Sequence, residues 1–231
     1  MHIHSAIFGE NAKKLYLCRA MPLQNLSDIH THHSGRADAL LSLPPQKAVE
    51  GCPTPYSLEL HPWHLANEEL GIRSEQLFEK AAAALSFDPN LLAIGECGLD
   101  NHCDTPLDDQ LRAFRLALRT AVQMRLPVII HCVGYWAEMM ACVKEFYPLP
   151  MVEGWGGAII HGFRKGPQLA HQLLDAGFSI SLGDKFNPEV ARAIPEERLY
   201  FETDESQTDI WTIRRKILSL RKYTTIQDEI Q

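Results

Sequence analysis

Eight short apolar segments with the character of β-strands alternate with helical patterns along this 231-residue chain, and that alternation constrains the fold more than any other feature. The segments span residues 26–32, 37–43, 56–61, 91–96, 127–132, 157–161, 178–182 and 199–204. Strands that alternate with helices favour a parallel sheet covered by helices, and eight of them favour closure into a barrel. We therefore predict an α/β fold, a (β/α)8 barrel of the TIM type.

The connecting helices are clearest in the second half of the chain, where apolar residues recur at helical spacing. Helices are predicted over residues 74–85, 111–122, 167–175 and 209–222. Ser74 and Asp108 are the expected N-caps of the first two helices, and Gly177 is the expected stop of the third.

The first half of the chain leaves little room for helices. Only residues 34–36 separate the first two predicted strands, and the proline-rich residues 44–55 allow a short helix at most. The first two βα units are therefore predicted to be shortened. Residues 1–20 have no clear strand or helix period, so we expect an N-terminal extension followed by a single barrel domain over residues 21–231.

The bulk composition restricts location and partners. A formal net charge of -7 argues against a general polyanion binder, so a nucleic-acid substrate would need a local basic rim or metal ions to offset repulsion. The six cysteines form no CxxC pair, which predicts reduced thiols in a cytoplasmic protein. No segment approaches the roughly 20 consecutive apolar residues of a membrane span, so we expect no membrane partner.

The strongest local signal is the pair His30 and His32 at the end of the first predicted strand. Side chains alternate along a strand, so both imidazoles point the same way and can bind one metal ion. Asp28 shares that face one step deeper and is expected to orient a histidine.

Four more groups that can bind metals stand where an apolar strand ends, and they are Glu96, His131, His161 and Asp204. In a barrel the carboxyl ends of all strands meet at one mouth, where active sites sit. A single buried histidine or glutamate is usually a core residue, but so many at strand ends predict a metal site. Glu202, on the same face as Asp204, is expected to support it through hydrogen bonds, whereas Cys97 and Cys132 should turn into the core.

The sequence resembles the TatD-type deoxyribonuclease family of amidohydrolase-like metal hydrolases. The motifs that carry the resemblance are IHTHH at 29–33, ELHPWH at 59–64, AIGECGLD at 93–100, PVIIHC at 127–132, IIHGF at 159–163 and FETDES at 201–206. The resemblance implies two divalent metal ions, one bound by His30 and His32 and the other by His131 and His161.

The resemblance also implies roles for the remaining polar residues. Glu96 would bridge the two ions, and Asp204 would bind the first ion and handle a proton, so both are catalytic candidates. His61 would face the substrate, although a strand-terminal histidine with no role is an equal alternative. Mixed histidine and carboxylate ligands suit zinc, manganese or magnesium, and the choice stays open. Such a pair lowers the pKa of bound water toward about 7 and neutralises charge on a phosphoryl group.

Basic residues near the mouth bear on the substrate. Arg164 and Lys165 follow His161 by three and four residues and could grip a phosphate, or could simply form a solvated loop. Arg36 also favours a nuclease, Lys185 is a weaker candidate, and Trp63 could stack on a base.

The preferred interpretation is a phosphodiesterase that trims DNA ends. One alternative is an enzyme with the same metals that acts on a small ester, lactone, amide or phosphoester, and the acidic net charge favours it. A metal-binding barrel without catalytic activity is a second alternative, which the full set of candidate ligands disfavours.

Overall fold

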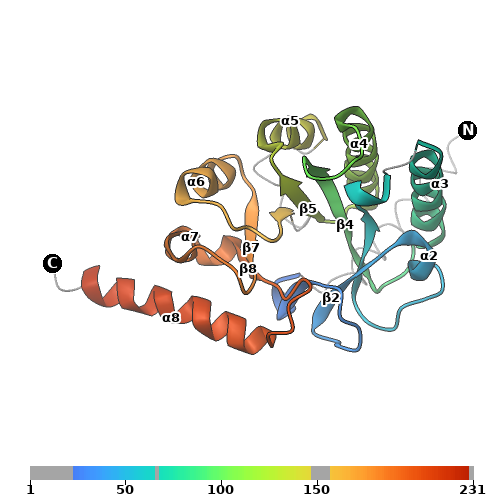
Figure 1. Ribbon diagram of the computed structural model, residues 1–231. Coiled ribbons are helices and arrows are strands. Elements are labelled where there is room, and N and C mark those ends of the chain that lie inside the picture. The colour runs from blue at the N-terminus through green and yellow to red at the C-terminus, as the bar shows by residue number, and fades with distance from the viewer. Residues whose placement is uncertain (1–22, 66–67, 147–156, 229–231) are drawn as a thin grey trace, which may run out of the picture.

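The computed structural model describes residues 23–65, 68–146 and 157–228 of the chain, so the predicted extension over residues 1–20 lies outside the described part. One parallel sheet contains all eight strands in the order of the sequence (Figure 1). The strands are β1 (Asp28–Thr31), β2 (Ala39–Leu43), β3 (Tyr56–Leu60), β4 (Leu91–Asp100), β5 (Val128–Val133), β6 (Ala158–Ile160), β7 (Ser179–Leu182) and β8 (Leu199–Phe201).

A parallel bridge between Thr31 and Asp204 joins the first strand to the segment that follows the last one. The backbone N–H of Asp204 donates to the carbonyl of His30 at 2.9 Å, and the N–H of His32 donates to the carbonyl of Asp204 at 3.2 Å. These bonds close the sheet on itself, and the predicted barrel is confirmed.

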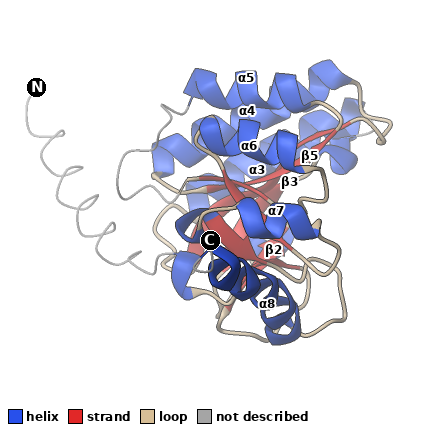
Figure 2. Ribbon diagram, turned by 90° about the vertical axis from the view of Figure 1, so that its left-hand side faces the viewer, coloured by secondary structure: helices blue, strands red, loops and turns tan. Residues whose placement is uncertain are grey.

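Helices surround the strands, as Figure 2 shows. They are α2 (Pro45–Ala48), α3 (Glu68–Ala84), α4 (Leu107–Met124), α5 (Trp136–Phe146), α6 (Pro167–Asp175), α7 (Pro188–Ala193) and α8 (Ile210–Asp228), with 3-10 turns η1 (Leu23–Asn25), η2 (Pro62–Leu65) and η3 (Glu196–Arg198). Residues 32–38 join β1 to β2 without a helix, and α2 between β2 and β3 has 4 residues. The predicted shortening of the first two βα units is confirmed.

None of the described helices combines the length and apolarity that crossing a bilayer requires.

Two of the predicted helix starts are wrong. Ser74 was predicted as an N-cap, but α3 begins at Glu68 and includes Gly71, although glycine is a poor helix former; the Ser74 hydroxyl donates to the carbonyl of His64 instead. Helix α4 begins right after Pro106, which fits the preference of proline for the N-terminus of a helix, and Asp108 lies in its first turn without capping it. The predicted stop of α6 at Gly177 is correct, because this glycine has a φ of 94° that other residues rarely adopt.

Apolar side chains fill two layers around the sheet. The larger cluster lies between strands and helices and includes Phe78 of α3 and Phe114 of α4. Ile129, Ile159 and Tyr200 belong to a second, smaller cluster. Ile129 and Ile159 precede His131 and His161 by two residues, so alternation puts each pair on the same, inward face. The polar residues at the mouth therefore lie above the apolar side chains of this second cluster.

Candidate metal centre

All six predicted ligands lie toward the carboxyl ends of five strands and gather in one cluster at the mouth of the barrel. His30 and His32 come from the end of β1, Glu96 from β4, His131 from β5, and His161 and Asp204 from positions just beyond β6 and β8. Several groups of three residues each have their potential ligand atoms within 4.8 Å of one another. Three of these groups are His30, His32 and Asp204; His30, Glu96 and His161; and His61, Glu96 and His131. A fourth set contains His161, Glu202 and Asp204.

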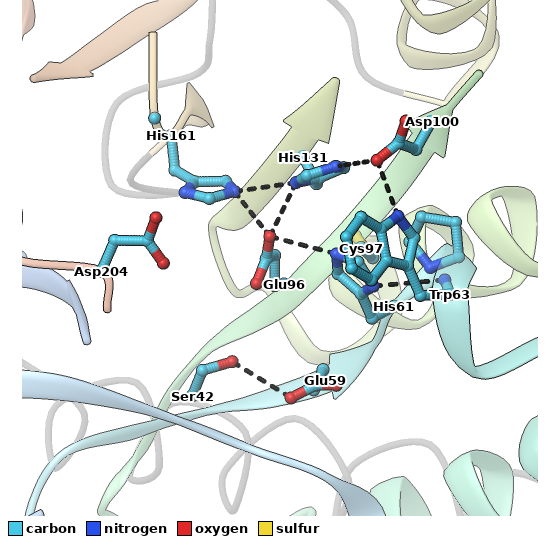
Figure 3. A network of polar contacts seen from close by, with 12 residues as sticks. Ser42, Glu59, His61, Trp63, Glu96, Cys97, Asp100, His131, His161 and Asp204 are labelled. Atoms are coloured by element: carbon cyan, nitrogen blue, oxygen red, sulfur yellow. Dashed lines mark hydrogen bonds and ion pairs between the residues drawn. The ribbon is translucent and has the colours of Figure 1, made fainter. Parts of the chain in front are cut away.

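The Glu96 carboxylate lies between two pairs of histidines. Its Oε2 is 3.3 Å from His30 Nε2 and 3.6 Å from His32 Nε2. Its Oε1 is 2.8 Å from His131 Nδ1 and 2.6 Å from His161 Nε2 (Figure 3). One oxygen therefore faces each pair, which is the arrangement that a bridging carboxylate needs.

Asp204 lies on the side of the first pair. Its Oδ1 is 3.7 Å from His30 Nε2 and 3.8 Å from His32 Nε2. The Asp204 side chain remains 25% exposed, whereas that of Glu96 is 6% exposed. Asp204 therefore borders the open mouth, and Glu96 lies below it.

A carboxylate lies behind each histidine of the second pair. His131 Nε2 is 3.0 Å from Asp100 Oδ2, and a carboxylate only accepts, so Nε2 donates to Asp100 and Nδ1 is the nitrogen that faces Glu96. His161 Nδ1 lies 3.7 Å from Glu202 Oε1, which accepts from the backbone N–H of Gly162. Glu202 is buried and points inward, as predicted, and stands behind His161.

The residues of this cluster fit a divalent cation. Neither ring nitrogen of the fully buried His30 has a hydrogen-bond partner among the described residues, and His161 Nδ1 also has none. Burying polar atoms without partners is costly, and coordination would satisfy His30 Nε2, the one of these nitrogens that faces Glu96. Burial raises the pKa of Glu96, but His161 and His30 outweigh that effect and hold the pKa well below its usual range. An ionised carboxylate among imidazoles is a donor set that first-row metals accept.

His61 takes part in the cluster as a donor. Its Nδ1 accepts a hydrogen bond from the backbone N–H of Trp63 at 3.2 Å, so in the neutral ring the proton is on Nε2. Nε2 lies 3.3 Å from Glu96 Oε1 and points a hydrogen toward the centre. A protonated nitrogen cannot ligate a metal, which favours a substrate-facing role for His61 over ligation.

Sequence reasoning missed Asp100 because it ended the fourth strand at Glu96. Strand β4 instead continues to Asp100, and residues 96, 98 and 100 share its inward face. Gly98 permits this extension, because a Cβ there would lie 1.9 Å from the carbonyl oxygen of His131. The even spacing of Glu96 and Asp100 in the ECGLD motif was the signal that could have found the second carboxylate.

Glu59 was also missed. It lies on β3, is buried, and approaches Ser42 Oγ at 3.5 Å (Figure 3). On its other side it lies 2.9 Å from His64 Nδ1. The hydrogen bond with Glu59 is the main reason that the pKa of His64 is raised. This pair extends the polar lining of the mouth toward β2.

The predicted basic residues divide into two locations. Arg164 is exposed, with Nη2 at 3.8 Å from Asp204 Oδ2, and lines a hollow of about 410 Å³ together with Lys185 and Phe186. Lys165, next to it, is exposed and has no ion-pair partner within 4 Å among the residues that the structure describes.

Arg36 does not belong to the mouth. Its guanidinium donates to Asp28 Oδ2, Asp38 Oδ2 and the Ser27 hydroxyl, at the amino ends of β1 and β2. Asp28 accepts from Arg36 and from the backbone N–H and hydroxyl of Thr203, so the prediction that it orients a histidine is wrong. These contacts stabilise the junction between β1 and the segment that follows β8. Arg36 therefore gives no support for a nuclease.

The two cysteines beside candidate ligands are buried, as predicted. Cys97 is fully buried and Cys132 is 7% exposed. Burial raises the pKa of both thiols, to about 12 for Cys132, so neither forms a thiolate at neutral pH. They pack in the core and offer no metal ligand.

A family model described as TatD related DNase matches residues 53–215 of this chain. The chain is 33% identical over 137 residues to the 3'-5' ssDNA/RNA exonuclease TatD of Citrobacter koseri, covering 54% of this chain and 50% of that protein. It is 34% identical over 128 residues to the uncharacterized metal-dependent hydrolase YabD of Bacillus subtilis, covering 52% of this chain and 48% of that protein. The chain thus spans about half the length of these curated relatives.

Two solved structures share the fold. The TatD homolog YJJV from Escherichia coli superposes with a TM-score of 0.62 at 18% identity, covering 86% of this chain and 96% of that chain. A hydrolase of the TatD family from Entamoeba histolytica superposes with a TM-score of 0.58 at 19% identity, covering 76% and 72%. Because the family model matches well over half of its residues, this chain belongs to the TatD-related DNase family.

Proposed function

We propose that this protein is a metal-dependent phosphodiesterase that removes nucleotides from the ends of single-stranded DNA. The single observation that carries the proposal is the Glu96 carboxylate, with one oxygen toward His30 and His32 and the other toward His131 and His161. A mononuclear site would not need two sets of nitrogen donors on opposite oxygens of one carboxylate.

The proposed ligands form two groups that share Glu96. His30, His32 and Asp204 would hold one divalent ion, and His131 and His161 would hold the other, with magnesium, manganese and zinc as the candidates. Two such ions would acidify a coordinated water toward neutrality and offset the negative charge of a phosphodiester. They would also offset the repulsion between DNA and a chain of net charge -7.

The protein's own side chains would orient the substrate and move the proton. Asp204 Oδ1 faces the histidines, which leaves Oδ2 at the mouth to accept a proton. His61 Nε2–H would donate to a phosphate oxygen, and Arg164 would hold a neighbouring phosphate from the edge of the mouth. The free thiols of the described cysteines support a cytoplasmic location, where thiols stay reduced.

Metal removal and return test this function. Protein treated with a chelator and then dialysed should lose hydrolysis of a 3'-labelled single-stranded oligonucleotide, and magnesium, manganese or zinc should restore it. The same samples should be assayed on a panel of small esters, lactones and phosphoesters. Full turnover in metal-free protein would exclude the mechanism, and restored activity on the small panel alone would favour the small-substrate alternative.

The basic loop can be tested by salt dependence. If Arg164 and Lys165 hold phosphates, replacing both with alanine should weaken DNA binding and reduce the slope of log K against log salt by about 0.7 per lost contact. A matched control, Lys80→Ala with Arg192→Ala, removes the same charge from exposed positions on α3 and α7. Equal effects in the two double variants would assign the loop to the solvated surface.

A further inference from the structure

We propose that Trp63 is a stacking platform for the nucleobase next to the scissile phosphate, and that Asp100 holds it in place. The proposal rests on the proposed function, since it names a binding surface of the same site. Trp63 lies in η2, directly after β3 at the mouth of the barrel, and is 57% exposed. Phe87 and Trp211 are exposed to a similar extent, so what distinguishes Trp63 is its position beside the polar cluster.

The indole ring is fixed before any ligand arrives. Its Nε1–H donates to Asp100 Oδ2 at 2.7 Å, and its backbone N–H donates to His61 Nδ1 at 3.2 Å. The ring stands edge-on to His61, with centroids 5.8 Å apart. The carbonyl of Pro62, the residue before Trp63, accepts from the Thr105 hydroxyl at 2.7 Å. The loop after β4 therefore holds η2 in position. A ligand that stacks on this ring would therefore lose little free energy to ordering it.

The same carboxylate connects this ring to the candidate metal centre. Asp100 Oδ2 accepts from both Trp63 Nε1 and His131 Nε2, and Asp100 Oδ1 accepts from the backbone N–H of His102. Gln110 fixes the Asp100 backbone by accepting from its N–H and donating to its carbonyl. A single oxygen, Asp100 Oδ2, therefore links the indole ring to His131, a candidate metal ligand (Figure 3). A phosphate at the centre would put its attached nucleoside within reach of the indole.

The chemistry of the exposed part of Trp63 selects the ligand class. Both of its N–H groups already have acceptors, so the ring face is what remains for a partner. A ring face binds flat aromatic groups and does not read hydrogen-bonding edges, and every nucleobase has such a face. Trp63 would therefore recognise a base of any identity and would distinguish nucleotides from sugar phosphates or simple phosphoesters.

Calorimetric titration of the metal-loaded protein with two ligands tests this role. Thymidine 5'-monophosphate carries a base, and deoxyribose 5-phosphate carries the same sugar and phosphate without one. The parent protein should bind the nucleotide about 5- to 150-fold more tightly, the range expected for one base stacked on an aromatic ring. The ratio should fall close to one in Trp63→Leu, remain largely intact in Trp63→Phe, and stay unchanged in Phe87→Ala, an exposed aromatic in the loop before β4 at the opposite end of the barrel.

Equal affinities in the parent, or an unchanged ratio in Trp63→Leu, would overturn the proposal. If Trp63→Leu does not fold, intrinsic fluorescence decides the question, because nucleotide binding should quench tryptophan emission in the parent and not in Trp63→Phe. Quenching of equal size in both would equally overturn it. The titration needs no turnover, so failure of this inference is separate from failure of DNA hydrolysis after metal return.

Discussion

Glu96→Ala should lower the metal content from the proposed two ions per chain to at most one and abolish measurable hydrolysis. The Glu96 carboxylate faces both histidine pairs, and its removal would leave two cations opposite each other with less negative charge between them. Metal per chain, measured by elemental analysis after equilibration with a buffered excess, provides the readout. Glu96→Gln keeps the shape of the side chain and one acceptor oxygen, and it replaces the alanine variant in this experiment if that variant folds poorly.

Glu202→Gln is the matched control for this prediction. Glu202 is a buried carboxylate at the same mouth, but it stands behind His161 at 3.7 Å from Nδ1. Loss of such an outer partner typically costs about 10- to 100-fold in metal affinity and leaves the number of sites unchanged. Two tightly bound metals in Glu96→Ala would mean that Glu96 is not the bridge, and the proposed dinuclear centre would be wrong.

Asp204→Asn should reduce turnover by about 10²-fold or more, the scale typical of losing a general acid or base. Asparagine keeps one oxygen ligand and the shape of the side chain but loses most of the basicity. It also tolerates the φ of 54° that Asp204 adopts, so the barrel should remain folded. Metal content and the thermal transition should stay close to those of the parent.

Glu205→Gln is the control for Asp204, because it removes one exposed carboxylate from the neighbouring position. We expect its turnover to match that of the parent. A comparable loss in both variants would point to a general electrostatic effect of the loop, and full turnover in Asp204→Asn would exclude a role in proton transfer.

Strand periodicity was sufficient to predict the barrel and to group the six candidate ligands. His131 and His161 each end a short apolar run, and two-residue alternation then points them inward regardless of the rest of the fold. The same rule failed at Asp100 because Gly98 weakens strand propensity and made the fourth run look shorter than it is. The reason for that glycine is tertiary, since it makes room for the backbone of His131 in the neighbouring strand.

Loop residues were beyond this kind of reasoning. Residues 32–38 lead from the mouth to the opposite end of the barrel, and the sequence does not show where along them the chain turns. Arg36 was therefore expected near the substrate, although its partners Asp28 and Asp38 lie at the amino ends of the first two strands. The exposure of Trp63 and its bond to Asp100 likewise depend on how η2 docks against the loop after β4.

The bridge between Thr31 and Asp204 links assembly of the metal centre to the order in which the chain is made. During synthesis His30 and His32 emerge long before Asp204, and contacts between such distant residues are slow to form. A nascent chain that ends before its eighth strand would present histidines without the carboxylate that completes the first ligand group. A metal held by this first ligand group under the proposed function would therefore be captured late, after release of the final strand and closure of the barrel.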